Sequence, residues 1–277
     1  MRFARFWQSR TNASGLVKAW GWSDQSEAEA GRNAEGRLAR ILNFLREGKD
    51  ALDRYGYGSD GVLRESVVEE GSLSDGSRFA VSRNAYGAFV LNAERVVFID
   101  VDVSLRVSLV DRLKGLFGRG VDLAAVFAAR EQEIRDWQRQ NPRYSVACYR
   151  TFAGFRLVIR NLLAGPEDEE VRRILRELCN DVRYRQLCAR QACFRARLTP
   201  KPFRIRKCPP PVRFPFEKAG DAAKFSSWSE GYLKVAAGYS VCRTPVIMGD
   251  AEPLPSVCEV LAIHDKACCR GDQLPLA

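Results

Sequence analysis

The stretch "RVVFIDVDVSL", residues 95–105, runs from apolar residues directly into two aspartates. Side chains along a strand alternate between its two faces, so residues two apart point the same way. Asp100 and Asp102 therefore share one face, while Ile99 and Val101 share the buried one. Neighbouring carboxylates repel each other unless a cation holds them, and Mg²⁺ is bound by one or two carboxylates together with substrate phosphates. The segment predicts a metal site at a strand end; a plain solvent-exposed strand end is the alternative.

The segments around this strand predict an α/β (α+β) fold, in which a mixed sheet with hairpins packs against helices. Before it, "RFAVS" and "AFVLNA" predict strands; after it, "YSVACYRT" and "FRLVIRN" predict a hairpin closed by the tight turn "FAG". Residues 121–138 repeat apolar side chains at helical spacing. Gly165-Pro166, followed by the acidic residues 167–170, is typical of a helix start, because carboxylates favour the positive end of the helix dipole.

The N-terminal sequence predicts a unit of its own. "FARFWQS" and "LVKAWGW" predict two strands, and a helix follows in which Asp24 and Glu27 form a capping box and Gly48 ends the helix. A glycine- and serine-rich stretch comes next and separates this unit from the rest. The chain is thus expected to have four parts: an N-terminal strand–helix unit (1–48), a connector (49–78), a core (79–216) and a C-terminal appendage (217–277).

Positive charge is concentrated in one segment. The chain of 277 residues has a formal net charge of +10, and residues 182–207 contain nine Lys or Arg and no Asp or Glu. Aromatic residues, among them Tyr184 and Phe203, lie between these cations, and this composition is typical of a phosphate- or nucleic-acid-binding surface. A solvated cationic face is the alternative. In "CFRARL" the alternation of a strand points Arg195 and Arg197 outward.

Composition limits the remaining classes of protein. Hydrophobic residues make up 46% and charged residues 28%, and we find neither a membrane-spanning apolar run nor a signal peptide, so we expect a folded cytoplasmic protein without membrane contacts. The nine cysteines lack the spacing of a disulfide framework, which favours reduced thiols. The single histidine excludes His-based triads that need a second histidine and HExxH zinc sites. A zinc site that includes Cys258, His264 and Cys268 stays open, as does the simple burial of small apolar thiols.

The segment "FIDVDVSL" resembles the haloacid dehalogenase signature, in which a nucleophilic aspartate opens a DxDx(T/V) strand. This resemblance implies a phosphatase that acts on a small phosphoester. Asp100 would be its nucleophile and Asp102 its general acid and base.

A second resemblance uses about half of the chain, residues 79–207. The archaeo-eukaryotic primase superfamily has an hhhDhD strand, then helices, a hairpin with the motif SGxGxH, a third acidic residue and a basic stretch. The chain is similar in order: "VFIDVD", the helix over 121–138, "TFAGFR" with Arg156 at the histidine position, Asp181, and the basic "RARLTPKP". This resemblance implies an RRM-like catalytic core and a metal-dependent nucleotidyltransferase of primase-polymerase type.

The primase resemblance also implies roles for individual residues. Asp100 and Asp102, with Asp181 as third catalytic carboxylate, would bind Mg²⁺ or Mn²⁺. The residues facing the nucleoside triphosphate would be Thr151, Gly154, Arg156 and Lys201. The residues along a single-stranded template or primed duplex would be Arg195, Arg197, Phe203 and Arg204. A nucleic-acid-binding module with weak catalysis on the same scaffold is the alternative.

Overall fold

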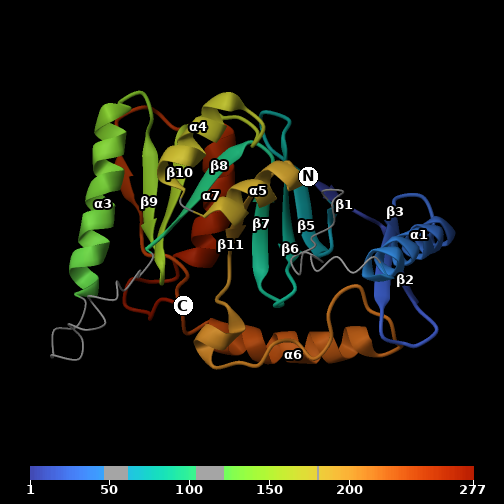
Figure 1. Ribbon diagram of the computed structural model, residues 1–277. Helices are drawn as coiled ribbons and strands as arrows, with labels where there is room; N and C mark the ends of the chain where they lie inside the picture. Colours follow the sequence, from blue (N-terminus) through green and yellow to red (C-terminus); the bar gives the residue numbers. More distant parts are fainter. Residues whose placement is uncertain (47–61, 104–121, 180) are drawn as a thin grey trace.

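The computed structural model describes residues 1–46, 62–103, 122–179 and 181–277 and has the mixed α/β architecture that the sequence predicts (Figure 1). Two four-stranded antiparallel sheets form its centre, helices pack around them, and a smaller strand–helix unit lies at one end. No helix within these ranges is long and apolar enough to cross a membrane. The RRM-like core that the primase resemblance implies stays a prediction.

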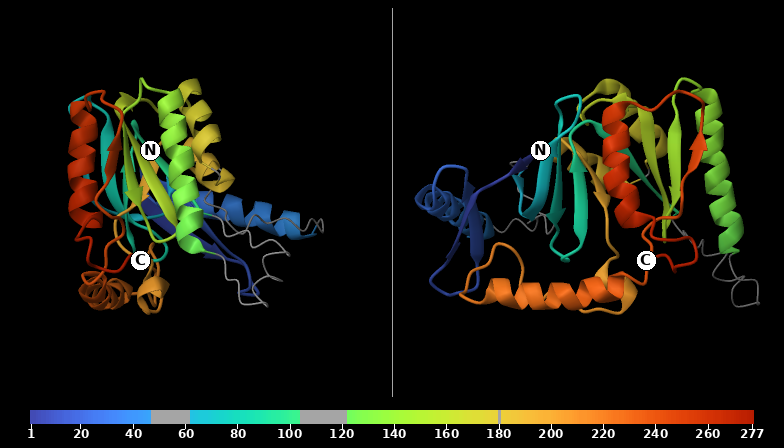
Figure 2. Two further views of the ribbon diagram at one scale, coloured as in Figure 1. Left: turned by 90° about the vertical axis from the view of Figure 1, so that its left-hand side faces the viewer. Right: turned by 180° about the vertical axis from the view of Figure 1, so that it is seen from behind.

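The first sheet contains the aspartate strand. Its order is β12 (Val246–Met248), β9 (Val146–Arg150), β10 (Gly154–Leu163) and β8 (Val96–Asp102). The strands β9 and β10 form the predicted hairpin, and β10 pairs with β8 on its other side. Helix α7 (Pro255–Cys268) covers one face of this sheet, while α3 (Leu123–Gln140) and α4 (Glu169–Leu178) cover the other (Figure 2).

Burial along β8 follows the predicted alternation. Ile99 and Val101 are fully buried within the main hydrophobic core, whereas Asp102 is exposed and Asp100 is half-buried. Phe98, on the aspartate face, is also buried, and its ring lies 5.6 Å from the ring of His264 in α7. One end of the strand is therefore part of the core on both faces, while its other end presents two carboxylates.

The second sheet contains a strand in the predicted connector. Its order is β11 (Phe194–Arg197), β7 (Phe89–Ala93), β6 (Arg78–Arg83) and β5 (Ser66–Ser72). β5 is an edge strand with mostly exposed residues, and its polar composition is typical of an edge that avoids aggregation, so it resembles a loop in the sequence. Tyr184 joins the two sheets because its hydroxyl donates to the carbonyls of Phe98 in β8 and Arg195 in β11.

The N-terminal unit has the predicted strands and helix but a different contact between them. Strands β2 (Phe6–Thr11) and β3 (Lys18–Ser23) form a hairpin that packs on α1 (Glu27–Arg46). Small residues of α1, not its leucines, are buried, and a Cβ added to Gly21 would lie 2.1 Å from the Ala34 backbone nitrogen. The predicted cap is also different: Ser26 accepts from the Glu29 backbone N–H, while Asp24 pairs with Arg2. Gly48 lies outside the described residues.

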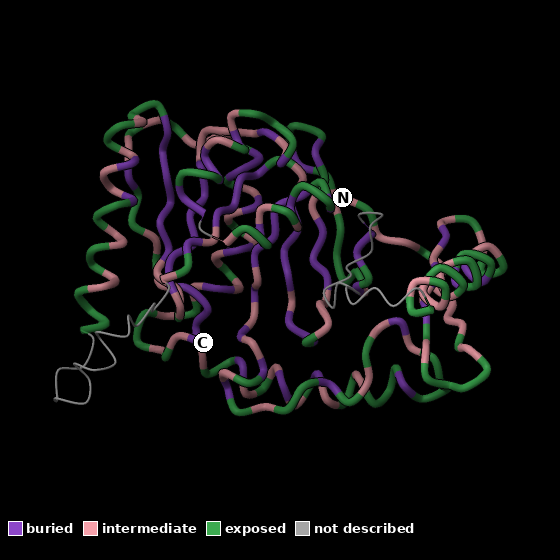
Figure 3. Tube along the Cα trace, viewed as in Figure 1, coloured by how far each residue is buried: buried purple, intermediate pink, exposed green. Residues whose placement is uncertain are grey.

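The C-terminal segment is integrated into the fold and is not an appendage. β12 extends the first sheet and α7 contributes Val257 and Val260 to the main core. Helix α6 (Asp221–Ala236) runs from the side of the N-terminal unit to the core (Figure 2), and β1 (Arg2–Phe3) pairs with β4 (Val62–Leu63). The central strands of both sheets are mostly buried, whereas α1 and α6 are largely exposed (Figure 3).

Candidate functional site

The two aspartates lie opposite the hairpin. In the β8–β10 pair Asp100 is the register partner of Arg156, and Asp102 is the partner of Gly154. Hydrogen-bonded strands approach so closely here that a Cβ on Gly154 would lie 2.1 Å from the Val101 carbonyl oxygen. Gly154 thus has a structural reason to lack a side chain, and its predicted contact with a nucleotide is not needed to explain it.

Three carboxylates gather near the end of β8. Asp181 is the N-cap of α5 (Val182–Gln191), where its carboxylate accepts from the Arg183 backbone N–H over 2.8 Å. Loss of surrounding water raises the pKa of Asp102, and the negative charges of Asp100 and Asp181 raise it further. The predicted third carboxylate therefore lies close enough to interact with the pair, and the group would gain from a bound cation.

Three cations stand beside these carboxylates. Arg197 ends β11, Lys201 immediately precedes the short 3-10 helix η1 (Pro202–Ile205) that follows, and Arg204 lies within that helix. Burial lowers the pKa of Lys201, and the positive charges of Arg197 and Arg204 lower it further. Burial together with Arg156 and Arg204 lowers the pKa of Arg197 to about 10. These three cations therefore repel one another.

Arg197 carries an unsatisfied donor. Its Nε is buried and has no hydrogen-bond partner within the described part of the chain. A buried guanidinium N–H without an acceptor costs free energy. An anion that accepts from Arg197 would satisfy this donor and would also relieve the repulsion among the three cations.

Arg156 does not face solvent, contrary to its predicted role at a nucleotide phosphate. It is 2% exposed, and its Nε donates to the Asp100 carboxylate over 3.2 Å. Burial opposes its charge, but the Asp100 carboxylate and the sulfurs of Cys242 and Cys268 together raise the pKa of Arg156. Its Nη1 donates to the Arg197 carbonyl and contacts Nε2 of His264, both at 3.0 Å. The residue at the histidine position of the primase motif is thus an internal ion-pair partner.

Arg195 is also buried, contrary to its predicted place along a nucleic acid. Its Nη2 donates to Glu65 over 2.6 Å and its Nη1 to Gln191 over 3.0 Å. Glu65 has a 1% exposed side chain, so the two charges form a buried pair that helps hold β11 on the second sheet. The alternation of "CFRARL" places Arg195 on the same face of the strand as Arg197, but Glu65 and Gln191 cover Arg195 on that face.

The remaining predicted residues lie at the surface near the cations. Phe203 is 62% exposed, and the guanidinium of Arg204 lies 4.5 Å from the centre of the Phe152 ring in the hairpin turn. Thr151 is half-buried, and its backbone N–H donates to the Gly154 carbonyl, which closes that turn. Two aromatic rings and a guanidinium thus border the carboxylate group.

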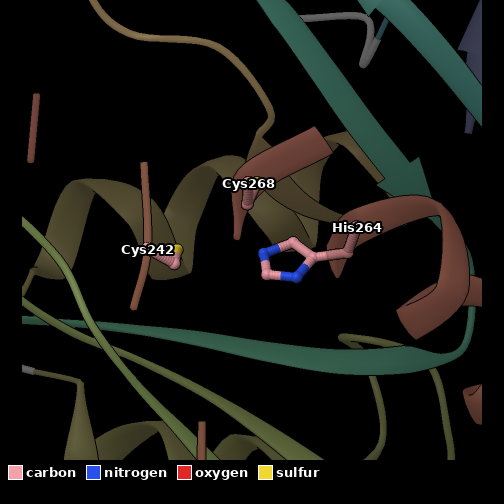
Figure 4. Close-up of side chains that lie close together, drawn as sticks. All are labelled: Cys242, His264 and Cys268. Carbon is pink, nitrogen blue, oxygen red and sulfur yellow. The ribbon is translucent and has the colours of Figure 1, made fainter. Parts of the chain in front are cut away.

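Of the three residues in the sequence-based zinc hypothesis, His264 and Cys268 lie together and Cys258 does not. Cys258 is exposed on α7, whereas Cys242, far along the chain, lies with His264 and Cys268 in a buried group (Figure 4). Within the described ranges this is the one set of three whose candidate ligand atoms all lie within 4.8 Å of one another. The spacing of His264 and Cys268, one helical turn apart, is the signal that the sequence offers.

A basic cavity in the N-terminal unit has no counterpart in the sequence predictions. It has a volume of about 270 Å³ and lies between β3 and α1. Its lining comprises Trp20, Gly21, Trp22, Arg32, Asn33, Gly36, Arg37 and Arg40. It contains three arginines and no acidic residue, and Arg32 and Arg40 are exposed without an ion pair in the described part of the chain. The spacing of these arginines places them near one face of α1.

Comparison with known protein families, curated proteins and solved structures found no match to this chain. The fold and the site therefore define the protein only as a mixed α/β chain with a carboxylate and arginine–lysine group at the end of an antiparallel strand.

Proposed function

We propose that the protein is a metal-dependent nucleotidyltransferase of primase-polymerase type that acts on nucleic acid. The observation that carries this proposal is the meeting of three carboxylates with three cations, one of which, Arg197, has a buried Nε without an acceptor in the described part of the chain. A metal–triphosphate complex supplies what each half of this group lacks, because it brings cations for the carboxylates and anionic oxygens for the guanidinium and ammonium groups.

The donor set fits Mg²⁺ or Mn²⁺. Carboxylate oxygens are the ligands these ions prefer, and Asp100, Asp102 and Asp181 offer them. The raised pKa of Asp102 comes partly from its two acidic neighbours, so a bound cation would remove a repulsion that the protein otherwise tolerates. When bound, such ions polarise the phosphoryl group and stabilise the attacking and leaving oxygens.

The side chains of the protein itself have three tasks in this reaction. Arg197 and Lys201 bind anionic phosphate oxygens, and the Nε of Arg197 has no other acceptor within the described residues. Arg156 holds the Asp100 carboxylate in place through its Nε. Exposed Phe203, with Phe152 and Arg204 beside it, offers a stacking surface for a base of a template strand.

Nucleic acid contacts in this proposal extend to the N-terminal unit. The cavity between β3 and α1 presents Arg32, Arg37 and Arg40 without a compensating acid. Lys and Arg that neutralise phosphates supply most of the sequence-independent affinity for nucleic acid. The nine cysteines are free thiols, in keeping with the cytoplasmic location that we propose.

One observation favours the binding module as second candidate. Arg156 already pairs with Asp100, so one of the two strand carboxylates has a protein cation beside it. A chain that kept the basic groups and lost the metals would bind nucleic acid without extending it. The phosphatase reading has no such support, because β8 lies in an antiparallel sheet and its Asp100 faces a hairpin.

The test is Mn²⁺-dependent extension of primed and unprimed single-stranded templates. Wild type is compared with Asp100→Asn/Asp102→Asn and with Glu133→Gln/Asp136→Asn, which removes two acidic charges from α3. We expect extension by wild type and the α3 control, and its loss in the strand variant. If none of the three proteins extends a template but all bind it in a salt-sensitive way, the binding module becomes the preferred proposal in place of the nucleotidyltransferase. Absence of both binding and extension would contradict both.

A further inference from the structure

A buried group of metal-ligating atoms joins the C-terminal segment to the first sheet, on the side opposite α3. His264 and Cys268 lie one turn apart on α7. Cys242 lies in the segment after α6 and forms an isolated antiparallel β-bridge with Thr151. All three side chains are fully buried, and they converge on a common centre (Figure 4). Cys242 is distant in sequence from His264 and Cys268, so it is the fold that brings the three ligands together.

The spacing of these atoms suits a small ion. Three atoms that lie within 4.8 Å of one another always leave a point no farther than about 2.8 Å from each. Zinc bonds measure about 2.3 Å to sulfur and about 2.0 Å to nitrogen, so each sulfur needs to close by about 0.5 Å and the nitrogen by about 0.8 Å.

The imidazole of His264 is held in the form that a metal requires. Its Nδ1 lies 2.7 Å from a carboxylate oxygen of Asp265 and donates to it, so its lone pair is on Nε2, which faces the two sulfurs. A carboxylate behind a histidine is the usual support for a metal ligand, because it fixes the ring and increases the basicity of the coordinating nitrogen.

A guanidinium nitrogen lies beside the three ligand atoms. Arg156 Nη1 lies 3.0 Å from His264 Nε2 and from the Arg197 carbonyl, and 3.9 Å from each of the sulfurs of Cys242 and Cys268. Four lone-pair atoms surround this one nitrogen, but it carries only two hydrogens, and these serve the two nearer acceptors. The sulfurs keep long, weak contacts. A four-coordinate metal ion would bind all four atoms at once.

We propose that Cys242, His264 and Cys268 form a zinc site in which Zn²⁺ replaces the Arg156 guanidinium, with the Arg197 carbonyl as the fourth donor. Binding deprotonates the two thiols and releases two protons, so the bound ion and its thiolates are neutral together. Arg156 then keeps its Nε contact with Asp100 and loses its contact with His264. The ion fastens α7 and the Cys242 segment to β11, which is the role of a structural zinc.

The experiment measures zinc affinity of the reduced full-length chain by competition with a chromogenic chelator, and metal content after gel filtration. Wild type is compared with Cys242→Ser, Cys268→Ser and Arg156→Met. Cys258→Ser, an exposed thiol on the same helix as Cys268, is the matched control. We expect one equivalent of zinc in wild type and the control, and a loss of at least about tenfold in affinity for both ligand variants. Arg156→Met removes the competing cation and should bind zinc more tightly.

Cobalt supplies a second measurement that does not depend on the stability of the variants. Wild type loaded with Co²⁺ should develop a thiolate-to-cobalt charge-transfer band, which Cys242→Ser should lack and Cys258→Ser should retain. Equal zinc affinity of wild type, Arg156→Met and Cys242→Ser would overturn the proposal. A band that disappears with Cys258→Ser, or a Cys242–Cys268 disulfide in place of a metal in the purified protein, would overturn it as well.

Discussion

Arg156 and Asp100 face each other across the β8–β10 pair, and the buried guanidinium donates to the half-exposed carboxylate over 3.2 Å. The same guanidinium reaches His264 on the far side, so a single side chain links the carboxylate group to the Cys–His group. The carboxylate face of β8 is also the face that α7 covers. A change at the carboxylates or at the Cys–His group therefore alters the contacts of Arg156, which touches both. The candidate site and the C-terminal helix are therefore parts of one polar network.

The buried pair of Arg195 and Glu65 should be important for stability and not for nucleic acid affinity. Arg195→Met leaves Glu65 charged, buried and without its cation, so we expect a loss of about 3 to 5 kcal/mol in the free energy of unfolding. The double variant Glu65→Leu/Arg195→Met should regain much of this loss, since no unpaired charge remains. Urea unfolding of the three proteins measures both values. A double variant no more stable than Arg195→Met would contradict the argument.

Local patterns of the sequence predict local structure well here, but they do not predict which residues distant in sequence pair with each other. The alternation in β8, the hairpin around "FAG" and the helix that begins at Asp168 are short-range features, and each is confirmed. The acceptors of Arg195 and Arg156 lie elsewhere: Glu65 is 130 residues from Arg195, and His264 is 108 residues from Arg156. An arginine on a predicted outward face is indistinguishable by pattern from one that an unseen carboxylate covers.

The same limit explains two other differences. β5 has the polar composition of an edge strand and therefore resembles a connector, because its exposed face needs no apolar residues. Cys242 has no neighbour that suggests a ligand, and only the fold brings it to His264 and Cys268. For the candidate site, the sequence predicts the carboxylates and Lys201 through strand and motif order, while the unsatisfied Nε of Arg197 becomes visible only in three dimensions.

Asp102→Asn should stabilise the metal-free protein at neutral pH. The pKa of Asp102 is raised in the fold, so the proton favours the native state, and the stability from this group is lost as pH rises through its folded pKa. The ionised carboxylate therefore destabilises the native state at neutral pH, and asparagine removes that charge for a gain below about 1 kcal/mol. The difference should vanish below the ordinary aspartate pKa of 3.8. Thermal unfolding across pH measures it, and Mn²⁺ should stabilise wild type but not the variant.

Arg197→Gln should weaken nucleoside triphosphate binding by roughly 10- to 100-fold, the range for a lost hydrogen bond to a charged group. Arg172→Gln, an exposed arginine on α4, is the control and should bind as wild type does. Burial and the positive charges of Arg156 and Arg204 lower the pKa of Arg197. An anionic phosphate beside the guanidinium would offset these effects. Fluorescence titration with a labelled nucleotide measures the affinity, and equal affinities of the two variants would speak against a phosphate at Arg197.

The basic cavity should contribute phosphate contacts outside the carboxylate group. If Arg32 and Arg40 each neutralise one phosphate of single-stranded nucleic acid, Arg32→Gln/Arg40→Gln reduces the slope of log affinity against log salt by about 1.4. Arg172→Gln/Arg176→Gln removes the same charge from the exposed face of α4 and should leave the slope near the wild-type value. Fluorescence anisotropy over a salt series compares the slopes. The same reduction in both variants would indicate a general effect of net charge and not a contact in the cavity.

The close approach of the hairpin to β8 predicts that Gly154→Ala destabilises the protein. A Cβ there meets the Val101 carbonyl oxygen at 2.1 Å and the Val103 nitrogen at 2.9 Å, and both are backbone atoms that cannot rotate away. We expect a loss of about 1 to 3 kcal/mol from the displaced strand pair. Gly231→Ala is the matched control, because no atom lies within 4 Å of its added Cβ and it is in the interior of α6. It should instead gain about 0.5 to 1 kcal/mol from helix propensity. Opposite signs of these two alanine substitutions in urea unfolding would establish that Gly154 is required by the backbone of β8, and a neutral Gly154→Ala would show that the hairpin adapts.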